Sequence, residues 1–384
     1  MKIALDVQSL FEEKKTGIGW TVKMMTENLL KNDENEFVLN CFTFRKYAKK
    51  REVLENYKKN NVTLQNCRWM ISGVYRRIGN ILPVPYTLFF RKKVDVTQFF
   101  NYVIPPGVQG IKSVFIYDMV YKAYPETMQK ETRAYMEAEM ERSCKCADLI
   151  ITISEFSKRE IIKYMNVDPQ KIEVVYCGID HDLFHNKIEN KDVEYVKEKY
   201  GLGEKYFLYL GTLEPRKNIN VIIKAYAKLK QDKDDLIPKL VLAGKYGWEC
   251  KNIFDLVKEL KLENEVILPG YVDEKDKPAM IRGSICFLFP SLYEGFGIPP
   301  LEAMACGTPT IVSNVASLPE VVGDAGIKIR FDDYKAMAEY MKRFDEDVTY
   351  REQWSKLGIE RAKKFSWESS ARSLLEIYNK HIKI

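Results

Sequence analysis

The sequence predicts an α/β protein made of two doubly wound parallel sheets. Short apolar runs alternate with longer stretches of helical periodicity, which is the pattern of parallel strands joined by crossover helices. A chain of 384 residues is also too long for one ordinary hydrophobic core, so two domains are expected. Ligands of such sheets bind at the carboxyl ends of the strands, and the functional residues are expected there.

The first series of elements starts at the first residue. Residues 1–7 are apolar enough for a buried strand, and residues 16–30 fit a loop that runs into a helix. Further strands are expected at residues 114–116 and 149–153. Ser157-Lys158-Arg159-Glu160 has the spacing of a capping box, so a helix is expected to begin there.

A second series follows residues 185–205, a polar, lysine-rich stretch that fits an interdomain connection. Its strands are expected at four short apolar runs, namely residues 206–210, 240–243, 266–268 and 285–289. The predicted domains therefore span residues 1–184 and 185–365.

Residues 293–302 form the most informative segment of the chain. They follow the expected strand at residues 285–289 and lead into a helix that opens at Pro299-Pro300, because proline suits the first turn of a helix. The amides and dipole of such a helix start can hold an anion. Glu294 is expected in the loop and Glu302 in the first turn, where carboxylates can accept hydrogen bonds from hydroxyl groups. The segment predicts a site for a sugar that carries a phosphate.

Composition excludes several classes of protein. No stretch approaches the length of a membrane-spanning helix, and residues 1–6 reach a charge too early for a signal peptide. The eight cysteines are scattered, which argues against a zinc site and a disulfide framework and for a reducing cytosol. A cytoplasmic protein is expected.

Several segments resemble the retaining glycosyltransferases of family 4, which have the GT-B architecture of two Rossmann-like domains facing a cleft. The most specific is Glu294-x7-Glu302 in its glycine-proline context, and the motif spanning residues 210–218 resembles the element that holds the donor's diphosphate. Residues 269–272 resemble the loop that receives the nucleotide base, and residues 16–19 resemble the glycine loop near the transferring sugar. The similarity is greatest to bacterial mannosyltransferases of surface-polysaccharide assembly.

The resemblance implies a role for each matching residue. Glu294 would bind hydroxyl groups of the donor sugar, Glu302 would bind the ribose, and Arg216 and Lys217 would neutralise the departing diphosphate. The resemblance further implies donor contacts at Gly17, Gly19, Gly211, Thr212, Gly270, Tyr271, Val272, Phe296, Gly297, Ile298 and Leu301. It also implies an acceptor-side domain at residues 1–184, a nucleotide-sugar domain at 185–365 and a helix at 366–384 that crosses back to the first domain.

Two positions depart from the family pattern. Tyr117-Asp118 stands where the family often has His-Asp beside the transferring sugar, and Thr212 stands where it often has arginine. Tyrosine can donate a hydrogen bond but cannot become a cation near neutral pH. Tyr117 and Asp118 are therefore kept as candidate catalytic residues, although Tyr117 can equally belong to the core.

The activity implied by the resemblance is transfer of a hexose, with retained configuration, from a nucleotide-diphosphate sugar to a hydroxyl of a glycan or lipid-linked glycan. GDP-mannose is favoured over a UDP-hexose. No cofactor and no metal are expected, and the Asp-x-Asp patterns are interpreted as surface charge: residues 180–182, 232–234 and 345–347. The alternatives are a sugar-nucleotide epimerase and a degenerate protein that only binds nucleotide sugars or membranes.

Residues 41–100 are strongly basic. They hold 13 Lys and Arg against 3 Asp and Glu, a net charge of +10, where the whole chain has +6. Aromatic and apolar residues are interleaved with these cations, which favours docking on the anionic inner face of the plasma membrane over a merely solvated surface. Nucleic acid is not expected as a partner, because no nucleic-acid-binding motif is present.

Overall fold

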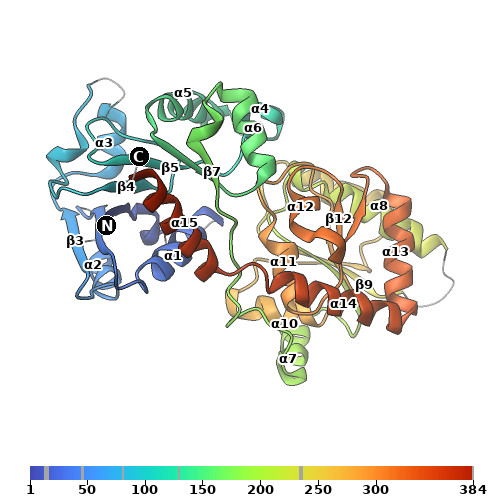
Figure 1. Ribbon diagram of the computed structural model, residues 1–384. Helices are drawn as coiled ribbons and strands as arrows, with labels where there is room; N and C mark the ends of the chain where they lie inside the picture. Colours follow the sequence, from blue (N-terminus) through green and yellow to red (C-terminus); the bar gives the residue numbers. More distant parts are fainter. Residues whose placement is uncertain (13–16, 45–46, 80–81, 129, 233–236, 383–384) are drawn as a thin grey trace. The chain divides into compact units, whose positions relative to one another are not determined.

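The computed structural model describes residues 1–12, 17–44, 47–79, 82–128, 130–232 and 237–382 (Figure 1). The chain divides into unit 1, made of Met1–Gly178 and Trp367–Ile384, and unit 2, made of Ile179–Ser366. Residues 179–184, which the sequence placed in the first domain, belong to unit 2. Ile179 forms a β-bridge with Ser366, and Nε2 of His181 lies 3.0 Å from the carbonyl oxygen of Phe365. These contacts hold the segment to unit 2.

Unit 1 contains a seven-stranded parallel sheet in the order β3-β2-β1-β4-β5-β6-β7. The strands are β1 (Lys2–Asp6), β2 (Glu36–Phe42), β3 (Val62–Cys67), β4 (Val96–Phe99), β5 (Ile111–Phe115), β6 (Leu149–Thr152) and β7 (Ile172–Val174). The direction of strand order reverses between β1 and β4. This is the topological switch point, where doubly wound sheets bind ligands.

Helices connect these strands, and a C-terminal helix completes the unit. They are α1 (Gly17–Leu29), α2 (Tyr47–Glu55), α3 (Ser72–Gly79), α4 (Val120–Ala123), α5 (Lys130–Cys146), α6 (Glu155–Met165) and α15 (Trp367–Ile382). Helix α15, dark red in Figure 1, packs beside α1. The buried hydroxyl of Tyr378 on α15 donates to Gln98 of β4, which also accepts from Ser113 of β5 at 2.7 Å. A buried polar network thus fastens α15 to the sheet of unit 1.

Unit 2 contains a six-stranded parallel sheet in the order β10-β9-β8-β11-β12-β13. The strands are β8 (Tyr206–Leu210), β9 (Lys239–Ala243), β10 (Val266–Gly270), β11 (Phe287–Phe289), β12 (Thr310–Ser313) and β13 (Ile327–Ile329). The helices are α7 (Asn190–Tyr200), α8 (Ile219–Gln231), α9 (Lys251–Glu259), α10 (Lys277–Arg282), α11 (Ile298–Ala305), α12 (Leu318–Val322), α13 (Tyr334–Glu346) and α14 (Val348–Ala362). The switch point of this sheet lies between β8 and β11.

The prediction of two doubly wound parallel sheets is confirmed. Every strand expected from an apolar run overlaps a strand of the structure, with ends that differ by up to three residues, as at β5. The predicted capping box is wrong. Helix α6 begins at Glu155, and its cap is Ser154, whose hydroxyl oxygen accepts from the amide of Ser157 at 3.0 Å. Within the described residues, no helix has the length and apolar character needed to cross a membrane.

Candidate active site

The predicted donor residues of unit 2 gather at its switch point, where the segments after β8 and β11 meet. The first segment contains the short 3₁₀ turn Pro215–Lys217, and the second leads into α11. The amide of Leu292 donates to the carbonyl of Arg216 at 2.9 Å, and Nδ2 of Asn218 donates to the carbonyl of Pro290 at 3.1 Å. These bonds fix the two segments side by side.

Glu294 forms ion pairs with both predicted cations. Its Oε1 accepts a hydrogen bond from Nζ of Lys217 and lies 3.1 Å from Nη1 of Arg216. The side chains of Glu294 and Lys217 are each only 12% exposed, so these charges interact in a partly dehydrated environment. The sequence motifs that supply them are 77 residues apart, and the parallel sheet brings them together.

The opposite charges in this cluster stabilise one another, the carboxylate of Glu294 on one side and the cations of Lys217 and Arg216 on the other. Burial alone would raise the pKa of Glu294, but the charges of Lys217 and Arg216 outweigh it and lower that pKa to about 2. Burial and the charge of Arg216 lower the pKa of Lys217, whereas Glu294 opposes that shift. Glu294 is therefore a carboxylate at neutral pH, held as a hydrogen-bond acceptor.

Arg216 is held by further groups. Its Nη1 donates to the carbonyl of Tyr293 at 2.7 Å, and its Nη2 donates to Oε1 of Glu214 at 2.8 Å. Nζ of Lys217 also lies 5.1 Å from the centre of the Phe289 ring, a cation–π contact. The cations are therefore positioned by the protein before any ligand binds, which is the arrangement that stabilises developing negative charge most effectively.

The loop between Glu294 and α11 has a shape that only certain residues allow. Gly297 has φ +117°, a conformation that favours glycine, and an added Cβ would lie 2.7 Å from Cδ2 of Leu318. The hydroxyl oxygen of Ser317 lies 2.8 Å from the carbonyl oxygen of Glu294 and 2.6 Å from that of Phe296. The prolines near the start of α11 carry no amide hydrogen, so Gly297 and Ile298 supply amides there.

Glu302 lies in a different environment from Glu294. Because α11 begins at Ile298, Glu302 falls in the second turn and not in the predicted first turn. Its side chain is partly buried, and no hydrogen bond or salt bridge from another described residue reaches its carboxylate. Burial raises the pKa of Glu302 to about 7, Lys277 opposes the shift, and Glu274 and Asp180 add to it. Its carboxylate remains available to accept hydrogen bonds from a ligand.

The ends of β8 and β9 approach each other closely beside this cluster. A Cβ on Gly244, which has φ +136°, would lie 1.8 Å from the carbonyl oxygen of Gly211. The hydroxyl of Tyr209 donates to the carbonyl of Thr212 at 2.9 Å. Gly211 and Thr212 thus lie in a tightly packed turn at the end of β8, close in sequence to Arg216.

The predicted base-binding loop, residues 269–272, is partly exposed. Tyr271 is 47% exposed, and Nζ of Lys245 lies 5.7 Å from the centre of its ring. Gly270 has open space beside its Cα. The side chains of Val272 and Leu301 are buried in the core, so any contact of these two residues with a ligand is restricted to their backbone.

The predicted residues of unit 1 are engaged in local contacts. The hydroxyl of Tyr117 donates to the carbonyl of Phe100 at 2.8 Å, and burial raises the pKa of this hydroxyl well above its usual value. Oδ1 of Asp118 accepts from the amide of Val120 at 3.0 Å. Gly17 and Gly19 lie in the first turn of α1 and not in a loop. Thr16 lies outside the described residues.

Sequence reasoning did not single out Glu214, Ser317 and Lys245. Glu214 directly precedes the Pro-Arg-Lys turn, so its place in the motif was a usable signal. Ser317 follows strand β12 by a few residues, and Lys245 follows β9 in the same way. Because ligands bind at the carboxyl ends of parallel strands, their positions in the sequence could have indicated both residues. No group of three or more His, Cys, Asp or Glu side chains within the described residues is arranged to hold a metal ion.

Comparison with known proteins shows the family of this chain. The family model "Glycosyl transferases group 1" matches residues 191–361, and "Glycosyltransferase Family 4" matches residues 17–183. The chain is 36% identical over 281 residues to O-antigen chain mannosyltransferase B of Escherichia coli, and the aligned region covers 72% of each protein. It is 32% identical over 241 residues to the serotype-specific mannosyltransferase WbdA of the same organism, and the aligned region covers 62% of this chain and 29% of WbdA.

Solved structures show the same fold. The crystal structure of Anabaena Alr3699/HepE in complex with UDP and glucose aligns with a TM-score of 0.71 over 99% of this chain and all of that chain, at 16% identity. The chain therefore has the fold of the GT-B glycosyltransferases. The chain belongs to glycosyltransferase family 4. These similarities support a hexosyltransferase acting on glycan acceptors and give no support to the epimerase alternative.

Proposed function

We propose that this enzyme transfers mannose from GDP-mannose to a hydroxyl of a glycan or lipid-linked glycan, with retained anomeric configuration. The observation that carries the proposal is the cluster of Arg216, Lys217 and Glu294 at the switch point of unit 2. The sugar is suggested by the similarity to proteins named as mannosyltransferases.

The proposed chemistry follows from charge. A nucleoside diphosphate gains negative charge as the glycosidic bond breaks, and Arg216 and Lys217 would stabilise that charge. Both cations contact Oε1 of Glu294, so its second carboxylate oxygen would accept hydroxyl groups of the donor sugar. Glu302 would accept the ribose hydroxyl groups. Because the two side chains and the amides at the start of α11 supply positive charge, we propose that neither a metal nor another cofactor is needed.

A panel of nucleotide sugars tests this proposal. The enzyme is incubated with GDP-mannose, UDP-glucose or UDP-galactose and a mannose disaccharide, with EDTA present or absent. We expect GDP release together with a trisaccharide whose new linkage has the configuration of the donor, and no effect of EDTA. Release of UDP and not of GDP would show that the donor is a UDP-hexose and not GDP-mannose. An epimerised donor without transfer to the disaccharide would contradict the proposed transfer reaction. Activity abolished by EDTA and restored by manganese or magnesium would contradict metal independence.

We also propose that residues 41–100 dock the enzyme on the inner face of the plasma membrane. Phe44, Trp69, Leu82 and Leu88 are large apolar side chains of this basic region that are more than two-fifths exposed. Arg91, Lys92 and Lys93 are exposed as well. Each cation near anionic lipid contributes about 1 kcal/mol, and apolar side chains can enter the headgroup layer.

Vesicle co-sedimentation tests the membrane proposal. Binding should rise with the fraction of anionic lipid and fall with salt, and it should weaken in the variant Trp69→Ser. The variant Tyr195→Ser, at an exposed aromatic residue of unit 2, is the control. Absence of binding at low salt, even to strongly anionic vesicles, would favour a soluble glycan acceptor.

A further inference from the structure

Glu214 is the fourth charged group of the cluster at the unit 2 switch point, and the proposed transfer does not use it. It directly precedes the turn Pro215–Lys217, and its Oε1 accepts a hydrogen bond from Nη2 of Arg216 at 2.8 Å. Both side chains are only 20% exposed, so their charges act in a partly dehydrated environment. A carboxylate in this position opposes the binding of an anion nearby.

The charges of the four clustered side chains cancel. Arg216 and Lys217 supply two positive charges, and Glu214 and Glu294 supply two negative charges. The ligand of the proposed reaction is a nucleoside diphosphate, which is itself an anion. Without the carboxylate of Glu214 the cluster would have a net positive charge and would bind the diphosphate more tightly. Glu214 therefore lowers the affinity of the site for phosphate groups.

The orientation of Arg216 does not require the charge of Glu214. Nη1 of Arg216 donates to the carbonyl of Tyr293 at 2.7 Å and lies 3.1 Å from Oε1 of Glu294. These contacts come from the segment after β11 and hold the guanidinium group independently of residue 214. A neutral acceptor at position 214 would satisfy Nη2 equally well. Positioning of Arg216 thus explains an acceptor at this place but does not explain a negative charge.

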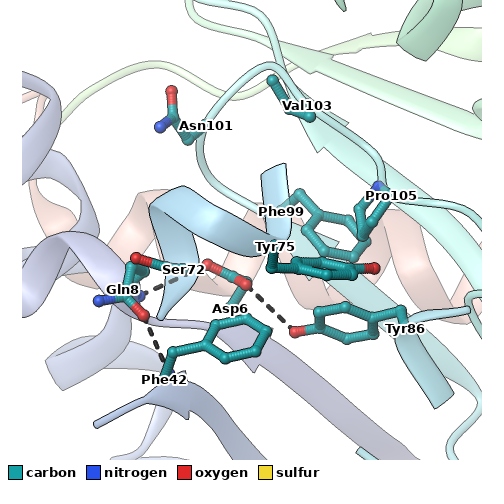
Figure 2. A pocket seen from close by; sticks show the side chains of 10 residues that line it. All are labelled: Asp6, Gln8, Phe42, Ser72, Tyr75, Tyr86, Phe99, Asn101, Val103 and Pro105. Atoms are coloured by element: carbon teal, nitrogen blue, oxygen red, sulfur yellow. Dashed lines mark hydrogen bonds between the residues drawn. The ribbon is translucent and has the colours of Figure 1, made fainter. Parts of the chain in front are cut away.

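The switch point of unit 1 also has a carboxylate, in a different environment. A hollow lined by buried aromatic rings lies there at the ends of β1 and β4, and we call it the unit 1 hollow (Figure 2). Oδ2 of Asp6 accepts from the hydroxyl of Tyr86 at 3.1 Å, and its Oδ1 accepts from the amide of Gln8 at 3.4 Å. Because these donors are uncharged, Asp6 provides a comparison for Glu214, whose donor is a cation.

We propose that Glu214 promotes release of the nucleoside diphosphate after the sugar has been transferred. The inference rests on the proposed function, because it requires a diphosphate leaving group. Cations that stabilise this group during bond cleavage also retain it as a product, and product release limits the rate of many enzymes. The free diphosphate carries more negative charge than the donor, since its bond to the sugar is broken. Repulsion by Glu214 is therefore greater for the product than for the donor, which favours exchange of one for the other.

Calorimetric titration of GDP, GDP-mannose and guanosine tests the inference, with the wild type and two variants of Glu214. Glu214→Gln removes the charge and keeps an acceptor for Nη2 of Arg216, whereas Glu214→Asp keeps the charge. Asp6→Asn is the control, because it removes a carboxylate at the switch point of the other unit. Inhibition of transfer by added GDP is measured for the same proteins.

We expect Glu214→Gln to bind GDP about 10-fold more tightly than the wild type, because a negative charge beside the phosphate groups is lost. The gain should be smaller for GDP-mannose and absent for guanosine, and GDP should become a stronger inhibitor of transfer. Glu214→Asp and Asp6→Asn should resemble the wild type. A merely structural ion pair would give no gain in affinity.

Unchanged or weaker binding of GDP to Glu214→Gln would overturn the inference, and so would an equal gain for GDP and GDP-mannose. Failure of the wild type to bind GDP or any other nucleoside diphosphate would instead contradict the proposed function.

Discussion

The two switch points of this protein have the same topology and opposite chemistry. In unit 2, the ends of β8 and β11 carry Arg216, Lys217 and Glu294 as a preformed cluster of ion pairs. In unit 1, aromatic rings line the hollow at the ends of β1 and β4, and Asp6 is the one charged side chain among the described residues that line it. The difference shows that the sheet fixes where a ligand binds, whereas the residues after the strands decide which ligand it is.

The unit 2 site also contains a contrast of its own. Glu294 is neutralised by two cations and has a lowered pKa, whereas Glu302, eight residues later, forms no salt bridge with another described residue and has a raised pKa. A carboxylate that is partly buried without hydrogen bonds from the protein destabilises the free protein. Its presence is explained if a ligand with hydroxyl groups completes its hydrogen bonds.

The largest effect is expected for Glu294→Gln. The change preserves side-chain volume but removes the charge that holds Lys217 and Arg216, so transfer should fall by about 10²–10³-fold. The free energy of unfolding should fall by about 1–3 kcal/mol, because two cations lose their partner. Steady-state kinetics and urea denaturation measure the two effects. Glu263→Gln, at an exposed residue of unit 2, is the control, and wild-type turnover in Glu294→Gln would remove Glu294 from the active site.

Arg216→Ala and Lys217→Ala should weaken binding of the nucleoside diphosphate more than binding of the nucleoside. Each removes a hydrogen bond to a charged group, worth about 10-fold or more in affinity. Calorimetric titration with GDP and with guanosine gives the comparison, and Lys224→Ala on α8 is the control. If each variant weakened both ligands equally, the cations would not contact the phosphates.

Glu302→Gln should lower donor affinity and raise stability at alkaline pH. The folded-state pKa of about 7 is above the usual value of 4.5, so the folded protein holds this proton more tightly than the unfolded chain. The wild type therefore loses stability as pH rises from about 4.5 to 7, by about 3 kcal/mol, and the glutamine variant does not.

The ribose role of Glu302 is tested in the same variant. The wild type should bind GDP about 10-fold more tightly than 2′,3′-dideoxy-GDP, and Glu302→Gln should lose this preference, because the hydrogen bonds to a charged acceptor are gone. Thermal unfolding of both proteins at pH 5 and pH 8 measures the loss of stability with rising pH that is expected for the wild type and not for the variant. Equal discrimination by both proteins would show that Glu302 does not contact the ribose.

The smallest effect is expected for Tyr117→Phe. The hydroxyl of Tyr117 already donates to the carbonyl of Phe100, so its loss should cost about 1 kcal/mol of stability and change turnover less than about threefold. Chemical denaturation and kinetics measure both. A loss of turnover beyond the loss of stability would mean that this hydroxyl orients the sugar.

The sequence predicted the unit 2 site because each half of that site is local in sequence. Residues 210–218 and 290–302 each follow a strand, and glycine and proline mark where the chain must turn. The exact start of α11 was not predicted, since a helix can begin one residue before a proline pair, and this shift of one residue places Glu302 at the start of the second turn.

The unit 1 hollow could not be predicted in the same way. Its residues come from β1, β2, α3, β4 and the loops beside them, and no short motif joins them. The strand β4 was itself missed, because Thr97 and Gln98 are polar although both are buried, and Gln98 is satisfied by Ser113 and Tyr378. Both the hollow and strand β4 therefore depend on contacts between residues that are far apart in the sequence.

The role of the unit 2 switch point as the donor site is tested most directly by a comparison of variants at the two switch points. GDP is titrated against the wild type, Lys217→Ala in unit 2 and Asp6→Asn in unit 1. The account predicts that Lys217→Ala loses affinity for GDP, whereas Asp6→Asn binds GDP like the wild type. Affinity for GDP that depended on Asp6 and not on Lys217 would contradict it.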